Sequence, residues 1–65
     1  MMVTYHKKFV YRVLVRAGQK VLEWPDSRTM NQAAAKRQFI RLSKERAATI
    51  QRKPAHESDT GFKAY

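Results

Sequence analysis

The sequence contains no cysteine, only two glycines and only two prolines among its 65 residues. Without cysteine the chain has no disulfide framework, no CxxC redox pair and no thiolate zinc site. A chain of this length forms one domain at most and leaves little room for a substrate pocket lined by its own core. A small apolar core or a binding partner must therefore hold the protein together.

Acidic residues are scarce, with five Asp and Glu against 14 Lys and Arg, which gives a formal net charge of +9 and a pI near 10.5. This excess indicates a polyanionic or acidic partner, although net charge does not determine the fold. Residues 1–20 hold five cations and no acid, and residues 32–53 hold seven cations and one acid. The same two segments hold most of the apolar residues, so we expect folded elements with charged outer faces rather than a basic disordered tail.

Long hydrophobic runs are also missing. No stretch approaches the ~18–20 uncharged apolar residues that a membrane-spanning helix requires. Lys7 and Lys8 precede an apolar run, as in a signal peptide, but Arg12 and Arg16 interrupt that run and no cleavage site follows. We therefore predict a protein of the cytoplasm, either of its own cell or of an infected host.

Motifs that would support catalysis are absent. The two histidines, His6 and His56, are far apart, and no partner residues surround either of them in a metal-ligand or acid–base spacing. The sequence has no glycine-rich phosphate loop, no HExxH and no GxSxG. We therefore expect no enzymatic activity, no catalytic residues, no metal and no cofactor.

Residues 8–16 alternate in the manner of a half-buried β-strand. One face carries Phe9, Tyr11, Val13 and Val15, and the other carries Lys8, Val10, Arg12, Leu14 and Arg16. Ala17-Gly18 offers a turn, and residues 20–24 supply a second short strand. The register that centres on this turn pairs Val13 with Leu22, Tyr11 with Trp24 and Arg12 with Glu23. Each of these pairs stays on one face, so the sequence predicts a β-hairpin.

A helix is expected after the hairpin. Pro25 ends the second strand, and Thr29 with Gln32 fits a capping box, so the helix should begin near Met30. Three consecutive alanines and the residues that follow them favour helix, and Pro54 stops the pattern, so the helix should end by about Lys53.

The helical wheel of this segment is amphipathic. The apolar stripe contains Ala35, Phe39, Leu42, Ala47 and Ile50. The outer arc contains Arg37, Arg41, Lys44 and Arg52. We expect Phe39 and Ile50 to pack on the hairpin face that bears Tyr11 and Val13. Arg46 falls near the middle of the stripe, where its stem could extend to solvent or contact a partner.

The predicted fold is thus α+β, a small antiparallel β-hairpin packed against one long C-terminal amphipathic α-helix. Residues 1–53 form a single ββα domain. Residues 54–65 lose the periodicity, and we expect a flexible or extended tail. Two alternatives remain for this tail: residues 61–65 could add a short third strand to the hairpin, and Tyr65 could dock into another protein.

The charge pattern favours a small nucleic-acid-binding protein that contacts the RNA or DNA backbone, as a subunit of a larger nucleoprotein assembly or as a homo-oligomer. The residues expected to contact phosphates are Lys8, Arg12, Arg16, Arg37, Arg41, Lys44 and Arg52. The residues expected to contact a partner protein are Arg46, Phe62 and Tyr65. The aromatic residues Phe9, Tyr11, Trp24 and Phe39 share the inferred buried face, so we expect them in the core rather than on bases.

Two other functions fit the same sequence. The first is a small non-enzymatic adaptor or inhibitor, of the kind that phages encode, which binds an acidic protein surface through its cations, its open sheet face and Tyr65. The second is peripheral binding of the amphipathic helix to an anionic membrane. Because a sheet is available to cover the helix stripe, we rank membrane binding last.

Overall fold

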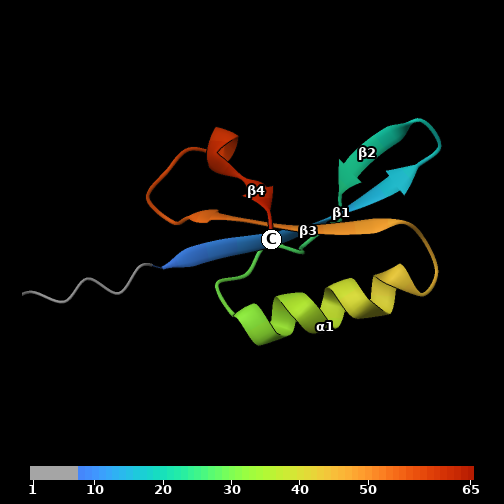
Figure 1. Cartoon of the computed structure of the whole chain (residues 1–65), viewed down its shortest axis with the longest axis horizontal. Helices are drawn as coiled ribbons and strands as arrows, with labels where there is room; N and C mark the ends of the chain where they lie inside the picture. The colour runs from blue at the N-terminus through green and yellow to red at the C-terminus, as the bar shows by residue number, and fades with distance from the viewer. Residues whose placement is uncertain (1–7) are drawn as a thin grey trace, which may run out of the picture.

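The computed structural model describes residues 8–65 as a four-stranded antiparallel sheet with one helix on one face (Figure 1). The elements in chain order are β1 (Phe9–Ala17), β2 (Lys20–Glu23), α1 (Gln32–Ser43), β3 (Ala48–Pro54), the 3-10 turn η1 (Asp59–Gly61) and β4 (Lys63–Ala64). The strand order across the sheet is β2-β1-β3-β4. The α+β class is confirmed, but the helix is short and lies in the middle of the chain, not at its C-terminal end.

The predicted hairpin forms, with its register shifted by two residues. Leu22 pairs with Val15 rather than with Val13, because the turn consists of Gly18 and Gln19. Gly18 has a φ of 67°, the left-handed conformation that glycine adopts without steric cost. A shift of two residues keeps every side chain on its face. The expected contact between Arg12 and Glu23 therefore still forms, now diagonally across the strands.

The core lies between the sheet and α1. One cluster contains Tyr11, Ala35 and Ile50, and a second contains Val13, Val15 and Leu42; Phe9, Phe39, Trp24 and Ala48 pack against them. The alternation of β1 places Tyr11, Val13 and Val15 toward the helix, as the sequence predicts. We call the opposite face, which carries Arg12, Leu14 and Gln51, the outer sheet face.

The expectation of a helix to Lys53 is wrong, since α1 ends at Ser43 and residues 48–54 form β3. The amides of Glu45 and Arg46 both bond to the Leu42 carbonyl and close the last turn. Strand β3 then pairs with β1 over its full length, from Phe9↔Pro54 to Val15↔Ala48. The second edge of β1 would otherwise present unpaired backbone groups, and β3 satisfies them while it places Ile50 in the core.

The connection from β2 to α1 leaves β1 after Trp24 and pairs with it again at Thr29. Thr29 exchanges two backbone hydrogen bonds with Tyr11, of 2.8 and 3.0 Å, so its backbone belongs to the sheet and not to the helix. Asn31 is the N-cap instead, and its side-chain oxygen accepts from the Ala34 amide at 3.0 Å. Asparagine is one of the best N-cap residues, which explains why the helix begins two residues later than expected.

Residues 55–65 return along the edge of β3 rather than extending away from the domain. Strand β4 pairs with β3 through Gln51↔Ala64 and Arg52↔Lys63, and the Tyr65 amide bonds to the Ile50 carbonyl at 3.1 Å. The short strand considered for residues 61–65 is therefore present, but it adds to β3 and not to the hairpin. Phe62 is buried, and its ring contacts cations of the outer sheet face.

Candidate nucleic-acid interface

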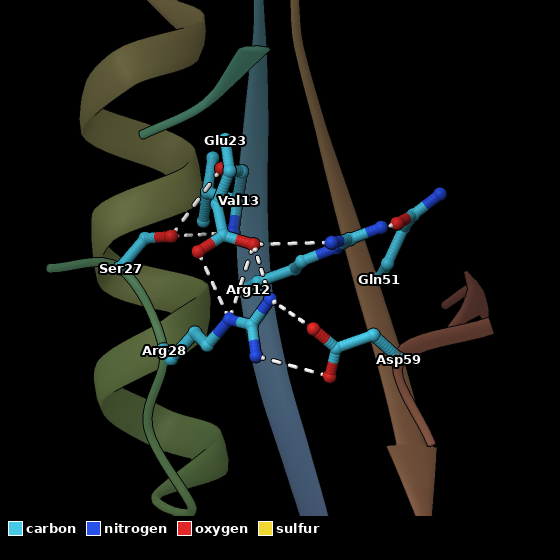
Figure 2. Close-up of polar contacts among 7 residues, drawn as sticks. All are labelled: Arg12, Val13, Glu23, Ser27, Arg28, Gln51 and Asp59. Atoms are coloured by element: carbon cyan, nitrogen blue, oxygen red, sulfur yellow. Dashed lines mark hydrogen bonds and ion pairs between the residues drawn. The ribbon is translucent and has the colours of Figure 1, made fainter. Parts of the chain in front are cut away.

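Two of the five acidic residues are engaged with arginines on the outer sheet face (Figure 2). The Glu23 carboxylate lies 3.0 Å from Arg12 and 2.9 Å from Arg28. The guanidinium of Arg28 also forms two parallel bonds to Asp59, of 3.1 and 2.9 Å. This cluster joins β1, β2, the loop before α1, and η1, so its role is to connect elements.

Arg12 is held on three sides. It donates to Glu23 and, at 2.9 Å, to the side-chain oxygen of Gln51, and its guanidinium lies 3.9 Å from the centre of the Phe62 ring. Its side chain is only 20% exposed. Because its charge is paired with Glu23 and its guanidinium packs on a ring, Arg12 is less available to a ligand than an exposed arginine.

The arginines lower the pKa of both carboxyl groups. Hydrogen bonds from Arg28 are the largest cause for Glu23 and for Asp59, and the Arg12 bond adds to the effect at Glu23. The same bonds raise the pKa of Arg28 above its already high value. All three groups are therefore ionised at neutral pH.

The helix presents a row of exposed cations on the side away from the sheet. We call this row, Arg37, Arg41 and Lys44, the helix ridge. Residues 32–43 contain no acid. Arg37, Gln38 and Arg41 line a shallow hollow of about 210 Å³. None of the ion pairs found within residues 8–65 involves the helix ridge, so its charge is available to an anionic partner.

Arg52 does not lie on the helix ridge, as a helix to Lys53 would have required. It projects from β3 on the helix side of the sheet, between two aromatic rings. Its guanidinium lies 4.2 Å from the centre of the Phe9 ring and 4.6 Å from that of Tyr65. The Lys36 amine lies 5.6 Å from the same Tyr65 ring. We call this alternating series, Lys36, Tyr65, Arg52 and Phe9, the aromatic–cation ladder.

A second hollow adjoins the ladder where the helix meets the edge of β3. It has a volume of about 390 Å³ and is lined by Lys36, Phe39, Ile40, Ile50 and Tyr65. Its walls are mainly apolar, with the Lys36 amine as the cationic group. We call it the Tyr65 hollow.

The remaining predicted site residues are dispersed. Lys8 and Arg16 are exposed on the outer sheet face, opposite the helix ridge. The expected phosphate-binding residues therefore do not form one surface: Arg37, Arg41 and Lys44 stay together, and Arg52 lies on the helix side of the sheet.

The three residues expected to meet a partner protein have different environments. Arg46 lies in the turn after α1, with its guanidinium 5.0 Å from the centre of the Trp24 ring. Phe62 is buried and packs within the domain. Tyr65 is 41% exposed, and it is the one of the three that offers an accessible aromatic ring.

Sequence reasoning missed two contributors. Lys36 is not among the predicted site residues, and only the folded C-terminal segment brings the Tyr65 ring to 5.6 Å from its amine. Phe9 is predicted in the core and does pack against it, but its ring also lies against the Arg52 guanidinium. A basic residue at the stripe border, one turn before exposed Ile40, was the available signal for Lys36.

Other chemistry finds little support in the part of the chain that the structure describes. Residues 8–65 contain no group of three or more His, Cys, Asp or Glu that could hold a metal ion. His56 is exposed, and His6 lies outside the described residues. None of the helices within residues 8–65 has the length and apolar character needed to cross a membrane.

Comparisons of the chain with protein-family models, with curated proteins and with solved structures find no match.

Proposed function

We propose that this protein binds nucleic acid through the phosphate backbone, with the helix ridge and the adjacent cations of the ladder as the contact surface. The observation that carries the proposal is the position of Arg37, Arg41 and Lys44, exposed together along α1 and its C-cap, with no acid within α1 itself. Cations of like sign three and four residues apart on a helix repel one another by a few tenths of a kcal/mol. A phosphate between them removes this repulsion, so an anionic ligand is favoured at this surface.

The use of the acids supports the same surface. Glu23 and Asp59 neutralise Arg12 and Arg28 at the other side of the sheet. These two acids thus lie away from α1, which contains no acid, whereas a helix that is merely solvated normally mixes charges of both signs. The apolar side of α1 is occupied, because Ala35 and Leu42 are buried against the sheet. A membrane-bound helix would need that apolar side free.

The proposal predicts a steep salt dependence of binding. Five cations are available to phosphates on this side: Lys36, Arg37, Arg41, Lys44 and Arg52. Neutralising about five phosphates gives a slope of log K against log salt near −4.5 for a duplex and near −3.5 for a single strand. Fluorescence anisotropy with a labelled oligonucleotide over a salt series measures this slope.

A charge-reversal variant locates the surface. Arg37→Glu with Arg41→Glu should weaken binding and make the slope shallower by about two. The matched control is Arg16→Glu with Lys20→Glu, which changes the net charge equally at the far end of the hairpin. We expect the control to retain a near-native slope. A flat salt response overturns nucleic-acid binding, and a larger effect of the control pair overturns the choice of surface.

Capture from a lysate, with and without nuclease, distinguishes a nucleic-acid partner from an acidic protein partner. If the adaptor hypothesis were correct, the same protein would be captured with and without nuclease treatment. We expect nuclease to abolish capture, because nucleic acid is the ligand or bridges to other components.

A further inference from the structure

We infer that the Tyr65 hollow accepts an unpaired nucleobase, so that the ligand of this protein is single-stranded nucleic acid. This inference rests on the proposed function and specifies its ligand class. Its elements are the apolar hollow, an accessible aromatic ring in its wall, and two cations near that ring.

The size and lining of the hollow suit a base. Its volume is about 390 Å³, and Phe39, Ile40 and Ile50 supply apolar walls beside the Tyr65 ring. Ile40 is 55% exposed and Tyr65 is 41% exposed, so the site is open from solvent. Two large apolar side chains exposed side by side, as Ile40 and Tyr65 are, indicate a binding surface. Stacking of a base on Tyr65 would remove that surface from water.

The Tyr65 ring is held in place before any ligand arrives. Its amide bonds to the Ile50 carbonyl at 3.1 Å, and its ring meets Tyr11 edge-to-face with centroids 5.3 Å apart. Its hydroxyl accepts a hydrogen bond from the Gln32 side chain. Because the backbone, the ring and the hydroxyl each have a contact, the side chain loses little conformational entropy when a base stacks on it.

Two cations lie near the ring, where they can contact a phosphate backbone that leads into the hollow. The Lys36 amine lies 5.6 Å and the Arg52 guanidinium 4.6 Å from the centre of the Tyr65 ring. The helix ridge follows on the adjoining side of the same helix. Proteins that bind single strands combine stacked aromatic residues with a cationic track, and each stacked base contributes whichever base it is. The observed arrangement contains both parts.

A duplex cannot use this site in the same way. Paired bases are stacked on their neighbours and present only their edges in the grooves, so none can lie flat against Tyr65. The helix ridge can still contact duplex phosphates. The inference therefore predicts a preference between ligands of equal charge, and the proposed function alone does not.

The experiment compares three probes with the full chain at one salt concentration. They are an oligothymidylate of about twelve nucleotides, its duplex with oligoadenylate, and an abasic single strand of the same phosphate count. We expect the oligothymidylate to bind about tenfold more tightly than the abasic strand, because only it can stack. The duplex should resemble the abasic strand once the different salt slopes are taken into account.

Variants of Tyr65 connect this preference to the hollow. Tyr65→Ala should bind the oligothymidylate about tenfold more weakly and the abasic strand nearly as the native protein does. Tyr65→Phe keeps the ring and loses only the hydroxyl, so it should retain the preference. Thermal unfolding of both variants shows whether the domain remains folded.

Cross-linking provides a test that needs no substitution. A 5-iodouracil placed in the single strand should cross-link to Tyr65 or Phe39, as identified by mass spectrometry. Equal binding of the oligothymidylate and the abasic strand, or cross-links confined to residues away from the hollow, would overturn the inference while the backbone-binding function stood. Failure of all three probes to bind would overturn both. Capture of an apolar peptide in the hollow without competition from oligothymidylate would also overturn the inference.

Discussion

Ser27 shows how one side chain completes the sheet. At Val13 the neighbouring edge chain turns away after Trp24, whose amide bonds to the Val13 carbonyl at 2.8 Å. The Ser27 hydroxyl fills the position, accepting from the Val13 amide at 3.1 Å and donating to its carbonyl at 3.4 Å. Both residues are almost fully buried, so water cannot substitute. Asp26, with a φ of 58°, forms the tight turn that brings Ser27 inward.

We predict that Ser27→Ala destabilises the protein by about 1–3 kcal/mol, because the buried amide of Val13 loses its partner. Urea denaturation followed by Trp24 fluorescence measures the change in the free energy of unfolding. Ser58→Ala removes a hydroxyl that is exposed, and it should alter stability by less than about 0.5 kcal/mol. Equal effects of the two substitutions would contradict the role assigned to Ser27.

At the scale of elements, the Arg12–Glu23–Arg28–Asp59 cluster connects segments that are far apart in the chain. Arg28 belongs to the loop before α1, yet its guanidinium bonds to Glu23 at the end of β2 and to Asp59 in η1. Phe62 lies under this cluster, near Arg12, Arg28 and Lys53. Lys53 in turn donates to the Glu57 carbonyl at 2.6 Å. The segment after β3 is therefore attached to the sheet by charge and by one buried aromatic ring.

The lowered pKa of Glu23 and Asp59 predicts acid sensitivity. Because folding lowers both values, the stabilisation is complete above their ordinary values of 4.5 and 3.8, and it is lost as the pH falls through the lower folded values. We expect the urea midpoint to fall steadily as the pH is lowered below about 4.5.

Glu23→Gln is the control for this pH dependence. The substitution keeps the shape of the side chain and removes its titration, so the midpoint at neutral pH should decrease and the decline with acid should become shallower. An unchanged pH profile in this variant would contradict the link between Glu23 and acid stability.

At the scale of the whole molecule, charge and stability oppose each other. The net charge of +9 produces repulsion across a domain whose core consists of two small clusters. Domains of this size without disulfides or metals rarely gain more than ~3–5 kcal/mol from a single core. An anionic partner that binds the folded state both relieves the repulsion and stabilises the fold by mass action.

We therefore predict that a bound oligonucleotide raises the melting temperature. At a free ligand concentration of about one hundred times Kd, the stabilisation should be about 2.7 kcal/mol. Differential scanning fluorimetry with and without oligothymidylate measures the shift. Arg37→Glu with Arg41→Glu should reduce the shift at the same ligand concentration. A melting temperature that is high in low salt and independent of the ligand would contradict this coupling.

Local patterns were sufficient for half of the fold. The alternation of β1 predicted which side chains enter the core, and the alanine-rich run predicted the central part of α1. The register of the hairpin was missed by two residues, because Ala17-Gly18 and Gly18-Gln19 both place a glycine in the turn and both preserve the faces. For the candidate interface, the helix ridge could be predicted from spacing alone, since its residues lie within α1 and at its C-cap.

The second half of the chain illustrates the limit of such patterns. Residues 48–53 fit a helix wheel through Ala47 and Ile50, and they also fit a strand in which Ile50 and Arg52 share one face. The residues of this segment alone do not determine whether it is a helix or a strand. The edge of β1 does, because a strand beside it satisfies the backbone groups of β1 and also buries Ile50.

The sequence by itself determined the charge excess, the buried face of β1 and the cationic face of α1, since each follows from the composition or from a period of two or 3.6 residues. The tertiary structure alone decided that β3 is a strand, that Phe62 and Tyr65 pack on the domain, and that Lys36, Tyr65, Arg52 and Phe9 meet. These contacts join residues as far apart in the chain as Phe9 and Arg52. The pairing of β3 with β1 and with β4 brings these residues together. A helical or strand period relates only residues that are close in the sequence, so it cannot predict such contacts.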